Sequence, residues 1–263
     1  MSHSSVNRVQ TGCNRSSPLR YQLASDLHIE YLDDPLASDF IKKKANVLVL
    51  GGDIGSLYKL DQLEKFLNEL HAFEKILYIP GNHEFYTVKN IKQKPYNQLL
   101  DDLYGLEQRI TNLYVLNCKS MIIDDIEFIG CTLWSNIGTN FFPKYRVRIY
   151  GFNNIIYQQQ YEKHLNFLKK ALTTYTHGIS DQSNRVVVTH YPPVDLETRT
   201  KFAYLYANNL TNMILSKNMK VWNFGHIHVN HMYFIDRVLM VTNQTGRAKD
   251  HVQDYVKDFI VTL

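Results

Sequence analysis

The chain contains 263 residues, of which 44% are hydrophobic and 21% are charged. This apolar content is enough for a sizeable core, and the modest charge excludes a disordered, charge-rich polymer. The formal net charge of +4 suits anionic substrates, but it falls well short of the dense basic stripe of a dedicated nucleic-acid binder. The composition therefore indicates a globular protein and leaves its function to be read from the motifs.

Cysteine usage and the N-terminal composition indicate a reducing compartment. Cys13, Cys118 and Cys131 are odd in number and have neither metal-like nor disulfide-like spacing, so a cytoplasmic setting is expected. No run of about 18 apolar residues is present, so no membrane span is expected. Residues 1–19 are rich in Ser and Asn without an apolar core, which predicts a flexible tail rather than a secretory signal. Residues 20–263 contain no repeat or linker and are interpreted as a single domain.

The predicted elements alternate between strands and helices. Apolar runs that end at a polar or glycine residue predict buried strands at 23–24, 47–50, 76–79, 186–189 and 221–224. Apolar stripes at three- and four-residue spacing predict helices over 57–73, 95–110 and 153–175. The region 114–134 has no helical period and predicts antiparallel strands, as do 232–242 and 259–263. This order indicates βαβ units, with the extra strands forming a second sheet.

A short polar motif follows each of the buried strands. In chain order the motifs are Asp26-Leu27-His28, Gly52-Asp53, Gly81-Asn82-His83-Glu84, His190 and Gly225-His226-Ile227-His228. Ligands of open α/β sheets gather at the carboxyl ends of the strands, so the motifs are expected to form one site. Their Asp, Asn and His side chains supply the oxygen and nitrogen donors that hold a pair of divalent cations. The sequence therefore predicts a metal-dependent enzyme.

Each motif also has an ordinary structural interpretation. An Asp-x-His pair often lies in a solvated turn, Asp53 could cap a helix, and Asn82 could occupy a left-handed turn. His190 could be held by a backbone acceptor, and paired histidines occur on surfaces by chance. The combination favours the metal site, because complementary donors recur in one order after successive strands.

These motifs resemble the pattern of the calcineurin-like metallophosphoesterase superfamily: D-x-H, G-D, G-N-H-[DE], H and G-H-x-H. The resemblance extends from about Tyr21 to Asn243 and looks closest to small single-domain bacterial-type phosphoesterases, through segments 25–30, 81–86 and 189–193. It implies an α/β fold, a four-layer α/β-β/α sandwich of two mixed sheets flanked by helices. The two-sheet prediction agrees with that implication.

The resemblance also implies the roles of the site residues. One metal ion would be held by Asp26, His28, Asp53 and His228, and the other by Asp53, Asn82, His190 and His226, with Asp53 as the bridge. The two divalent ions would be Mn, Fe, Zn or Mg, with Mn favoured. A hydroxide that bridges them would attack phosphorus in line. His83 would face the substrate and stabilise or protonate the leaving oxygen.

Two segments depart from patterns of the superfamily. Its protein Ser/Thr phosphatases carry G-D-x-V-D-R-G, whereas this chain has Ser56 and Leu57 where the second Asp and the Arg would fall. This argues against a protein phosphatase and leaves open what orients His83. The small bacterial-type members often have Asn-Pro-Arg-Gly-Tyr near the end, whereas residues 243–247 here read Asn-Gln-Thr-Gly-Arg. No phosphate contact is therefore assigned to this segment.

The predicted function is hydrolysis of a phosphodiester or phosphomonoester, with a small phosphate ester as substrate. The first alternative is a nuclease acting on DNA or RNA. A basic and aromatic run supports it, and a solvated loop explains the same run: Lys144, Tyr145, Arg146, Arg148 and Tyr150. The second alternative is a non-catalytic metal-binding interaction module. The presence of every expected ligand counts against it.

The segment after the fourth motif bears on specificity. Residues 198–210 include Tyr204, Tyr206, Asn208 and Asn209. This segment would either line the pocket or form a helix that packs its tyrosines. Because no long insertion is present, we expect an open site without a separate lid domain.

Overall fold

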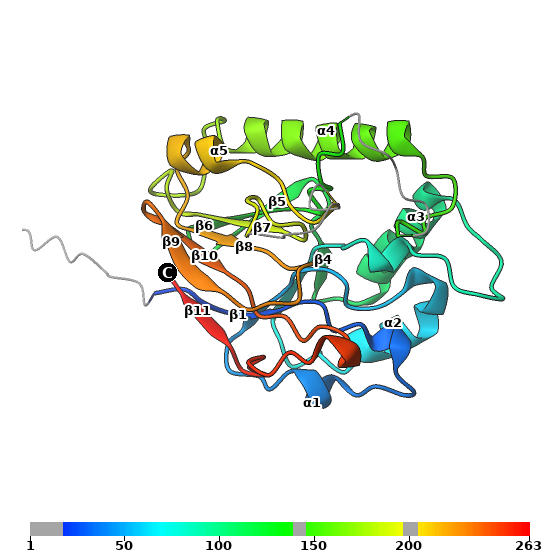
Figure 1. Ribbon diagram of the computed structural model, residues 1–263. Helices are drawn as coiled ribbons and strands as arrows, with labels where there is room; N and C mark the ends of the chain where they lie inside the picture. The colour runs from blue at the N-terminus through cyan, green and yellow to red at the C-terminus, as the bar shows by residue number, and fades with distance from the viewer. Residues whose placement is uncertain (1–17, 139–145, 197–204) are drawn as a thin grey trace, which may run out of the picture.

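The computed structural model describes residues 18–138, 146–196 and 205–263 (Figure 1). The predicted tail at residues 1–19 therefore lies almost wholly outside the described residues, as do Lys144, Tyr145 and Tyr204. The division of the chain into a tail and one domain stays a prediction. Among the described residues, no helix has both the length and the apolar character needed to cross a bilayer.

The first sheet has five strands in the order β11-β1-β2-β3-β4. Strands β1 to β4 run parallel, and β11 is antiparallel to β1. Their bounds are β1 Arg20–Ala24, β2 Val47–Leu50, β3 Lys75–Tyr78, β4 Leu113–Val115 and β11 Ile260–Thr262. Every residue of β2 is buried, because alternate side chains enter the apolar clusters on the two faces of the sheet. This two-sided burial explains its continuously apolar sequence.

The second sheet has six strands in the order β5-β6-β7-β8-β10-β9. Its four central strands run parallel, and the edge strands β5 and β9 are antiparallel to their neighbours. The bounds are β5 Lys119–Ile123, β6 Ile126–Cys131, β7 Arg185–Thr189, β8 Val221–Asn223, β9 Met232–Ile235 and β10 Val238–Val241. Asp124 and Asp125, between β5 and β6, have φ of 46° and 67°, as the two-residue turn of a tight hairpin requires.

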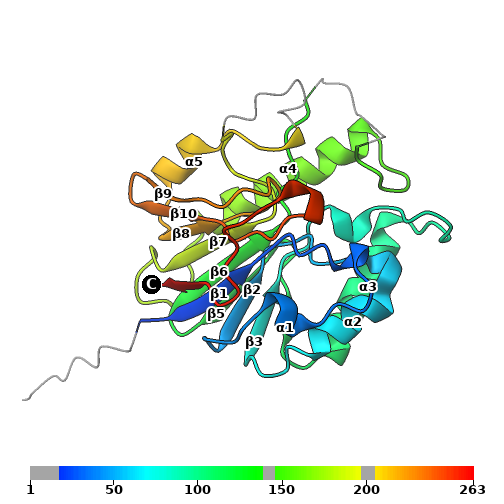
Figure 2. The same ribbon diagram turned by 60° about the horizontal axis from the view of Figure 1, so that its bottom comes forward.

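The two sheets pack face to face, and helices cover their outer faces (Figures 1 and 2). Helices α1 (Ala37–Phe40), α2 (Leu60–Asn68) and α3 (Tyr96–Arg109) cover the first sheet. Helices α4 (Asn154–Ala171) and α5 (Thr211–Ser216) cover the second. The predicted four-layer sandwich of two mixed sheets is confirmed.

Two of the three predicted helices are shorter than their apolar stripes. The predicted helix 57–73 begins as a 3-10 turn, η2 (Leu57–Lys59), and α2 then ends at Asn68. The predicted helix 153–175 ends at Ala171. Just past this end, the hydroxyls of Thr173 and Thr174 donate to carbonyls of the last turn. These bonds satisfy carbonyl groups that a longer helix would have used, and so they end α4.

The prediction that residues 114–134 form antiparallel strands is wrong in two respects. Strand β6 pairs parallel with β7 on the side away from β5. Strand β4 joins the first sheet and pairs parallel with β3, with Tyr78 opposite Val115. Helix α3 connects these two strands, and a helical crossover of this kind returns the chain in the parallel direction. Strands β5 and β6 pair antiparallel as predicted.

Candidate metal centre

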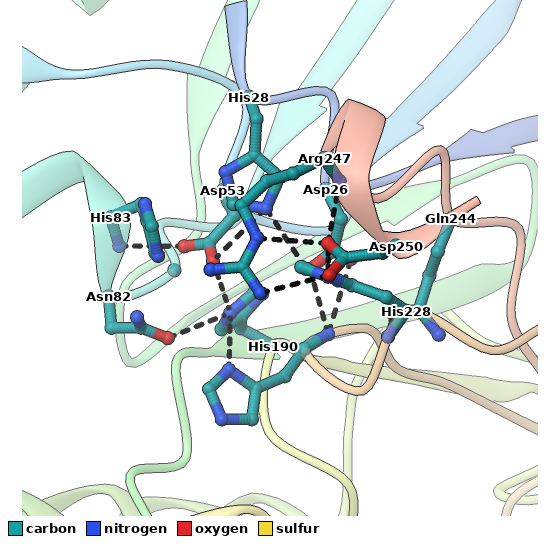
Figure 3. Close-up of polar contacts among 12 residues, drawn as sticks. Asp26, His28, Asp53, Asn82, His83, His190, His228, Gln244, Arg247 and Asp250 are labelled. Carbon is teal, nitrogen blue, oxygen red and sulfur yellow. Dashed lines mark hydrogen bonds and ion pairs between the residues drawn. The ribbon is translucent and has the colours of Figure 1, made fainter. Parts of the chain in front are cut away.

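The predicted donors converge where the carboxyl ends of strands from both sheets meet (Figure 3). Asp26 and His28 follow β1, Asp53 follows β2, Asn82 follows β3, His190 follows β7, and His226 and His228 follow β8. A bridge between Ser25 and Gln244 joins segments that follow β1 and β10 at this edge. The structure thus brings together all the side chains that the motifs placed at strand ends.

The donors fall into two clusters, and within each cluster the ligand atoms lie within 4.8 Å of one another. The first cluster contains Asp26, His28 and His228, and the second contains Asp53, His190 and His226. The amide oxygen of Asn82 joins the second cluster, 3.1 Å from Nε2 of His190. Each cluster draws its donors from both sheets.

Asp53 lies between the two clusters. Its Oδ2 atom is 3.3 Å from Nε2 of His190 and 3.9 Å from Nε2 of His28. Gly81 makes room for this carboxylate, because a Cβ atom at that position would collide with Oδ1 of Asp53. Burial raises the pKa of Asp53, but the nearby charges of His190 and His83 outweigh this and hold its pKa well below the usual range. The ionised carboxylate is therefore placed to contact both clusters.

Three of the histidines turn one ring nitrogen outward and the other toward the clusters. The outward Nδ1 contacts are His28 to Glu30 at 3.2 Å, His190 to the Gly51 carbonyl at 3.0 Å, and His228 to Asp250 at 2.6 Å. A proton on Nδ1 satisfies each oxygen acceptor and leaves the Nε2 lone pair facing inward. Two of these inward nitrogens, on His28 and His228, lie 3.0 Å apart.

His226 presents its ring the other way round. Its Nδ1 faces Nε2 of His190 at 3.3 Å, and its Nε2 lies 3.3 Å from the carbonyl of Leu205. A proton on Nε2 would satisfy that carbonyl and leave Nδ1 as the inward donor. The tautomers of all these histidines thus follow from their outer partners.

The converging donors fit divalent cations. Imidazole nitrogens with carboxylate and amide oxygens, and no thiolate, suit Mn, Fe, Zn or Mg. The two clusters could therefore hold one cation each. Burial lowers the pKa of His190, but the Asp53 carboxylate raises it to about 9. A cation must displace a proton at that nitrogen in order to bind.

The backbone at the clusters is strained. Asp26, His28, Asp53, His226 and His228 have φ of 54°, 51°, 53°, 74° and 55°. Such left-handed conformations are uncommon for residues other than glycine. They cost on the order of 1–3 kcal/mol each and persist where the surrounding structure enforces them, as at functional sites. These five positions therefore carry a cost in stability.

Glu30 orients His83, which the sequence analysis left open. Nδ1 of His83 lies 3.0 Å from Oε1 of Glu30 and 3.4 Å from the hydroxyl of Tyr31. The backbone N–H of His83 donates to Oδ1 of Asp53 at 2.7 Å. Glu30 lies in the 3-10 turn η1 (Ile29–Tyr31), two residues after His28. That spacing after the first motif is the signal that could have identified it.

Glu84 fastens the loops that carry Asp53 and Asn82. Its carboxylate accepts the backbone N–H groups of Gly81, Asp53 and Ile54 at 2.8, 3.1 and 2.9 Å. The hydroxyl of Tyr78 donates to it at 2.8 Å. Burial and the Asp53 carboxylate raise the pKa of Glu84 to about 8. Glu84 ends the motif Gly81-Asn82-His83-Glu84, but the motif pattern does not predict this role.

An open cavity of about 310 Å³ faces the clusters. Its wall contains several cationic side chains: Arg146, Arg148, Arg247 and Lys249. Arg247 belongs to the segment for which no phosphate contact was predicted, and it also pairs with Asp250 at 2.9 Å. The positive wall and the cation donors together suit an anionic ligand.

The segment 198–210 is described only from Leu205 onward. Within that part, Leu205 and Tyr206 line the cavity, and the Tyr206 hydroxyl accepts from Arg146 at 2.9 Å. Asn208 is instead buried and accepts the backbone N–H of Asn136. Of the two alternatives, Tyr206 follows the pocket-lining one.

A family model described as calcineurin-like phosphoesterase matches residues 20–230. The chain belongs to this family, and the resemblance seen in the motifs is confirmed. Membership assigns the protein to the metal-dependent phosphoesterases as a class.

Individual proteins are similar to this chain in sequence or in fold. An uncharacterized protein of Acanthamoeba polyphaga mimivirus is 29% identical over 264 residues, covering 88% of this chain and 92% of that protein. The structure of a phosphopantetheinyl hydrolase from Mycobacterium tuberculosis has a TM-score of 0.75 at 14% identity, covering 94% of this chain and 96% of that chain. A protein of Thermus thermophilus has a TM-score of 0.50 at 12% identity, covering 87% and 90%. At such identities the structural likeness shows the fold alone.

Proposed function

We propose that this protein hydrolyses a small phosphate ester at a centre of two divalent cations, with Mn favoured. The cations would be held by Asp26, His28 and His228 on one side and by Asn82, His190 and His226 on the other, with Asp53 shared. The observation that carries the proposal is the inward orientation of the ring nitrogens, which their outer hydrogen bonds enforce. A cluster of histidines serving only to stabilise the fold would not need to point its lone pairs into one space.

The side chains around the clusters have separate tasks. When bound, such cations neutralise phosphate oxygens and make a coordinated water acidic enough to act near neutral pH. His83, fixed by Glu30 and by its backbone bond to Asp53, lines the cavity and would donate a hydrogen bond or a proton to the departing oxygen. Arg148 and Arg247 would offset the remaining charge of the phosphate from the cavity wall.

The proposal is tested with nitrophenyl phosphate as a monoester and bis-nitrophenyl phosphate as a diester. The protein is loaded separately with Mn, Zn, Mg or Ni, and its metal content is measured. We expect turnover of at least one ester that depends on metal. In Asp53→Asn it should fall by about 10³-fold or more, because the shared negative donor is lost. Asp61→Asn, an exposed Asp of α2, is the matched control and should retain full activity.

Retained turnover in Asp53→Asn would contradict the role of Asp53. A metal-loaded protein that is inert toward both esters would favour the non-catalytic interaction module.

One observation bears on the nuclease alternative. Arg146 and Arg148, from the basic run, line the metal cavity. A nuclease would use them to bind the phosphate backbone, so hydrolysis of DNA or RNA should weaken steeply as salt is raised. Hydrolysis of a small ester that depends little on salt, without action on nucleic acid, would favour the small-molecule proposal.

A further inference from the structure

A second cavity adjoins the cavity that faces the clusters. It encloses about 730 Å³, and the two cavities share Arg148, Arg247 and Lys249 in their walls. Its lining also includes His28, so it opens beside the first cluster. A volume of this size is typical of sites that hold small organic ligands.

Away from Arg148, Arg247 and Lys249, the wall of the second cavity exposes more apolar than polar surface. Its apolar side chains are those of Leu27, Tyr31, Leu32, Phe40, Ala248 and Val252, and Thr245, His251 and Gln253 add polar groups to the wall. Tyr31 and Leu32 are 55% and 39% exposed, although they are large side chains next to a buried core. Covering such a surface with an apolar group removes it from water and favours binding.

Tyr31 reaches from the second cavity to His83, which lines the first. Its ring lines the second cavity, and its hydroxyl lies 3.4 Å from Nδ1 of His83. His83 is the group proposed to meet the departing oxygen. The apolar cavity therefore begins on the side of the metal centre from which a leaving group would extend.

We infer that the second cavity binds the organic group that leaves with this oxygen, and that this group is an apolar chain. The inference rests on the proposed function, because it assigns the cavity by its position relative to His83. The shared side chains of Arg148, Arg247 and Lys249 bind the phosphate end, and the wall beyond them accommodates several carbons. The substrate class is thus an amphipathic phosphate ester with an alkyl-like leaving group, rather than one with a densely hydroxylated sugar.

The test measures binding of methyl-, butyl- and octylphosphonate to the metal-loaded protein by calorimetry. These compounds carry the phosphate-like head and cannot be hydrolysed. Full burial of one methylene strengthens binding about fourfold, so butylphosphonate should bind at least about tenfold more tightly than methylphosphonate even with partial burial. Equal affinities across the series would overturn the inference.

Variants test whether the dependence of affinity on chain length arises in the second cavity. Replacing Leu32 and Val252 together by serine should reduce the butyl-to-methyl ratio to below about threefold, while the affinity for methylphosphonate stays unchanged. Leu36→Ser is the matched control, because Leu36 is 43% exposed nearby but is not among the residues that line the cavity. A double variant that keeps the full ratio would place the chain elsewhere and overturn the inference.

Parallel hydrolysis of the nitrophenyl esters separates the two proposals. Binding that strengthens with chain length, in a protein that hydrolyses neither ester, would refute the proposed function and leave the cavity as a binding site for apolar chains. If the protein hydrolyses an ester but its affinity for phosphonates does not depend on chain length, only the inference is refuted.

Discussion

Glu30 couples the first cluster to His83. The same oxygen, Oε1, lies 3.2 Å from Nδ1 of His28 and 3.0 Å from Nδ1 of His83. Burial raises the pKa of Glu30, but its bonds to the two histidines outweigh this and lower it. A charged carboxylate at this point favours the proton on Nδ1 of each ring and so fixes both tautomers.

Glu30→Gln keeps the side-chain shape and removes the charge. We expect kcat for the most readily hydrolysed nitrophenyl ester to fall about 10- to 100-fold with little change in KM, because the ring is misoriented while the cavity stays intact. The Nδ1–H resonance of His83, followed by NMR in the metal-loaded protein, should shift as well. Glu162→Gln, an exposed Glu of α4, is the control. Unchanged kcat and an unchanged His83 resonance would together rule out the positioning role.

At the scale of elements, α4 supports the loop that follows β6 through a buried histidine. The backbone N–H of Leu133 donates to Nδ1 of His164 at 3.1 Å, and Leu133 has a φ of 49°. Burial lowers the pKa of His164 to about 3. The imidazole must therefore stay neutral for the fold to keep this contact.

This contact predicts a loss of stability in acid. The folded-state pKa of His164 is depressed below the unfolded value of about 6.5, so the unfolded chain takes up the proton first and stability falls as pH drops below about 6.5. Near pH 4.5 the loss is about 3 kcal/mol of the free energy of unfolding. His164→Asn preserves an acceptor near Nδ1 and removes the titrating group.

Urea unfolding between pH 8 and pH 4.5 measures the free energy of unfolding of the wild type and of His164→Asn. The Asn variant should be less stable at pH 8, because the smaller side chain leaves a cavity. Its deficit relative to the wild type should then shrink by about 3 kcal/mol toward pH 4.5. The exposed His177→Asn variant should follow the wild type. If the free energy of unfolding changes with pH in the same way for His164→Asn and the wild type, His164 does not titrate on unfolding.

The sequence could predict the strands and their polar ends because those signals are local. Continuous apolar runs mark strands buried on both faces, and the donors sit directly after them. The pairing of β4 depends on the α3 crossover, which no residue in 113–115 encodes. The role of Glu30 depends on the turn around His28, whose φ is 51°. The pairing of β4 arises only when distant segments pack, so a local pattern could not supply it. The spacing of Glu30 after His28 could have identified this residue, but its contact with His83 forms only in the folded chain.

At the scale of the whole molecule, a polar contact crosses the apolar layer between the sheets. Nδ2 of Asn223, on β8, donates to the hydroxyl of Tyr21, on β1, at 2.8 Å. Both residues are fully buried, and the contact spans 202 positions in the chain. Most other side chains between the sheets are apolar. The bond therefore adds a directional contact between the two sheets, besides the bridge between Ser25 and Gln244 at their edge.

Tyr21→Phe should lower the free energy of unfolding by about 1–3 kcal/mol, since it leaves the Asn223 amide without its acceptor in the interior. Chemical unfolding measures the change. The double variant Tyr21→Phe with Asn223→Leu should recover part of the loss, because both polar partners are then removed. Tyr175→Phe, at a 65% exposed tyrosine, is the control. A single variant as stable as the wild type would mean that the bond contributes nothing.

The origin of the donors has one more consequence. In the first cluster, Asp26 and His28 follow a strand of the first sheet and His228 follows a strand of the second. In the second cluster, Asp53 follows a strand of the first sheet, and His190 and His226 follow strands of the second. An ion bound in either cluster would link the two sheets. Neither half of the chain contains all the residues of a cluster, so the clusters form only when the two sheets have packed together. Metal binding would therefore report that the chain has folded completely.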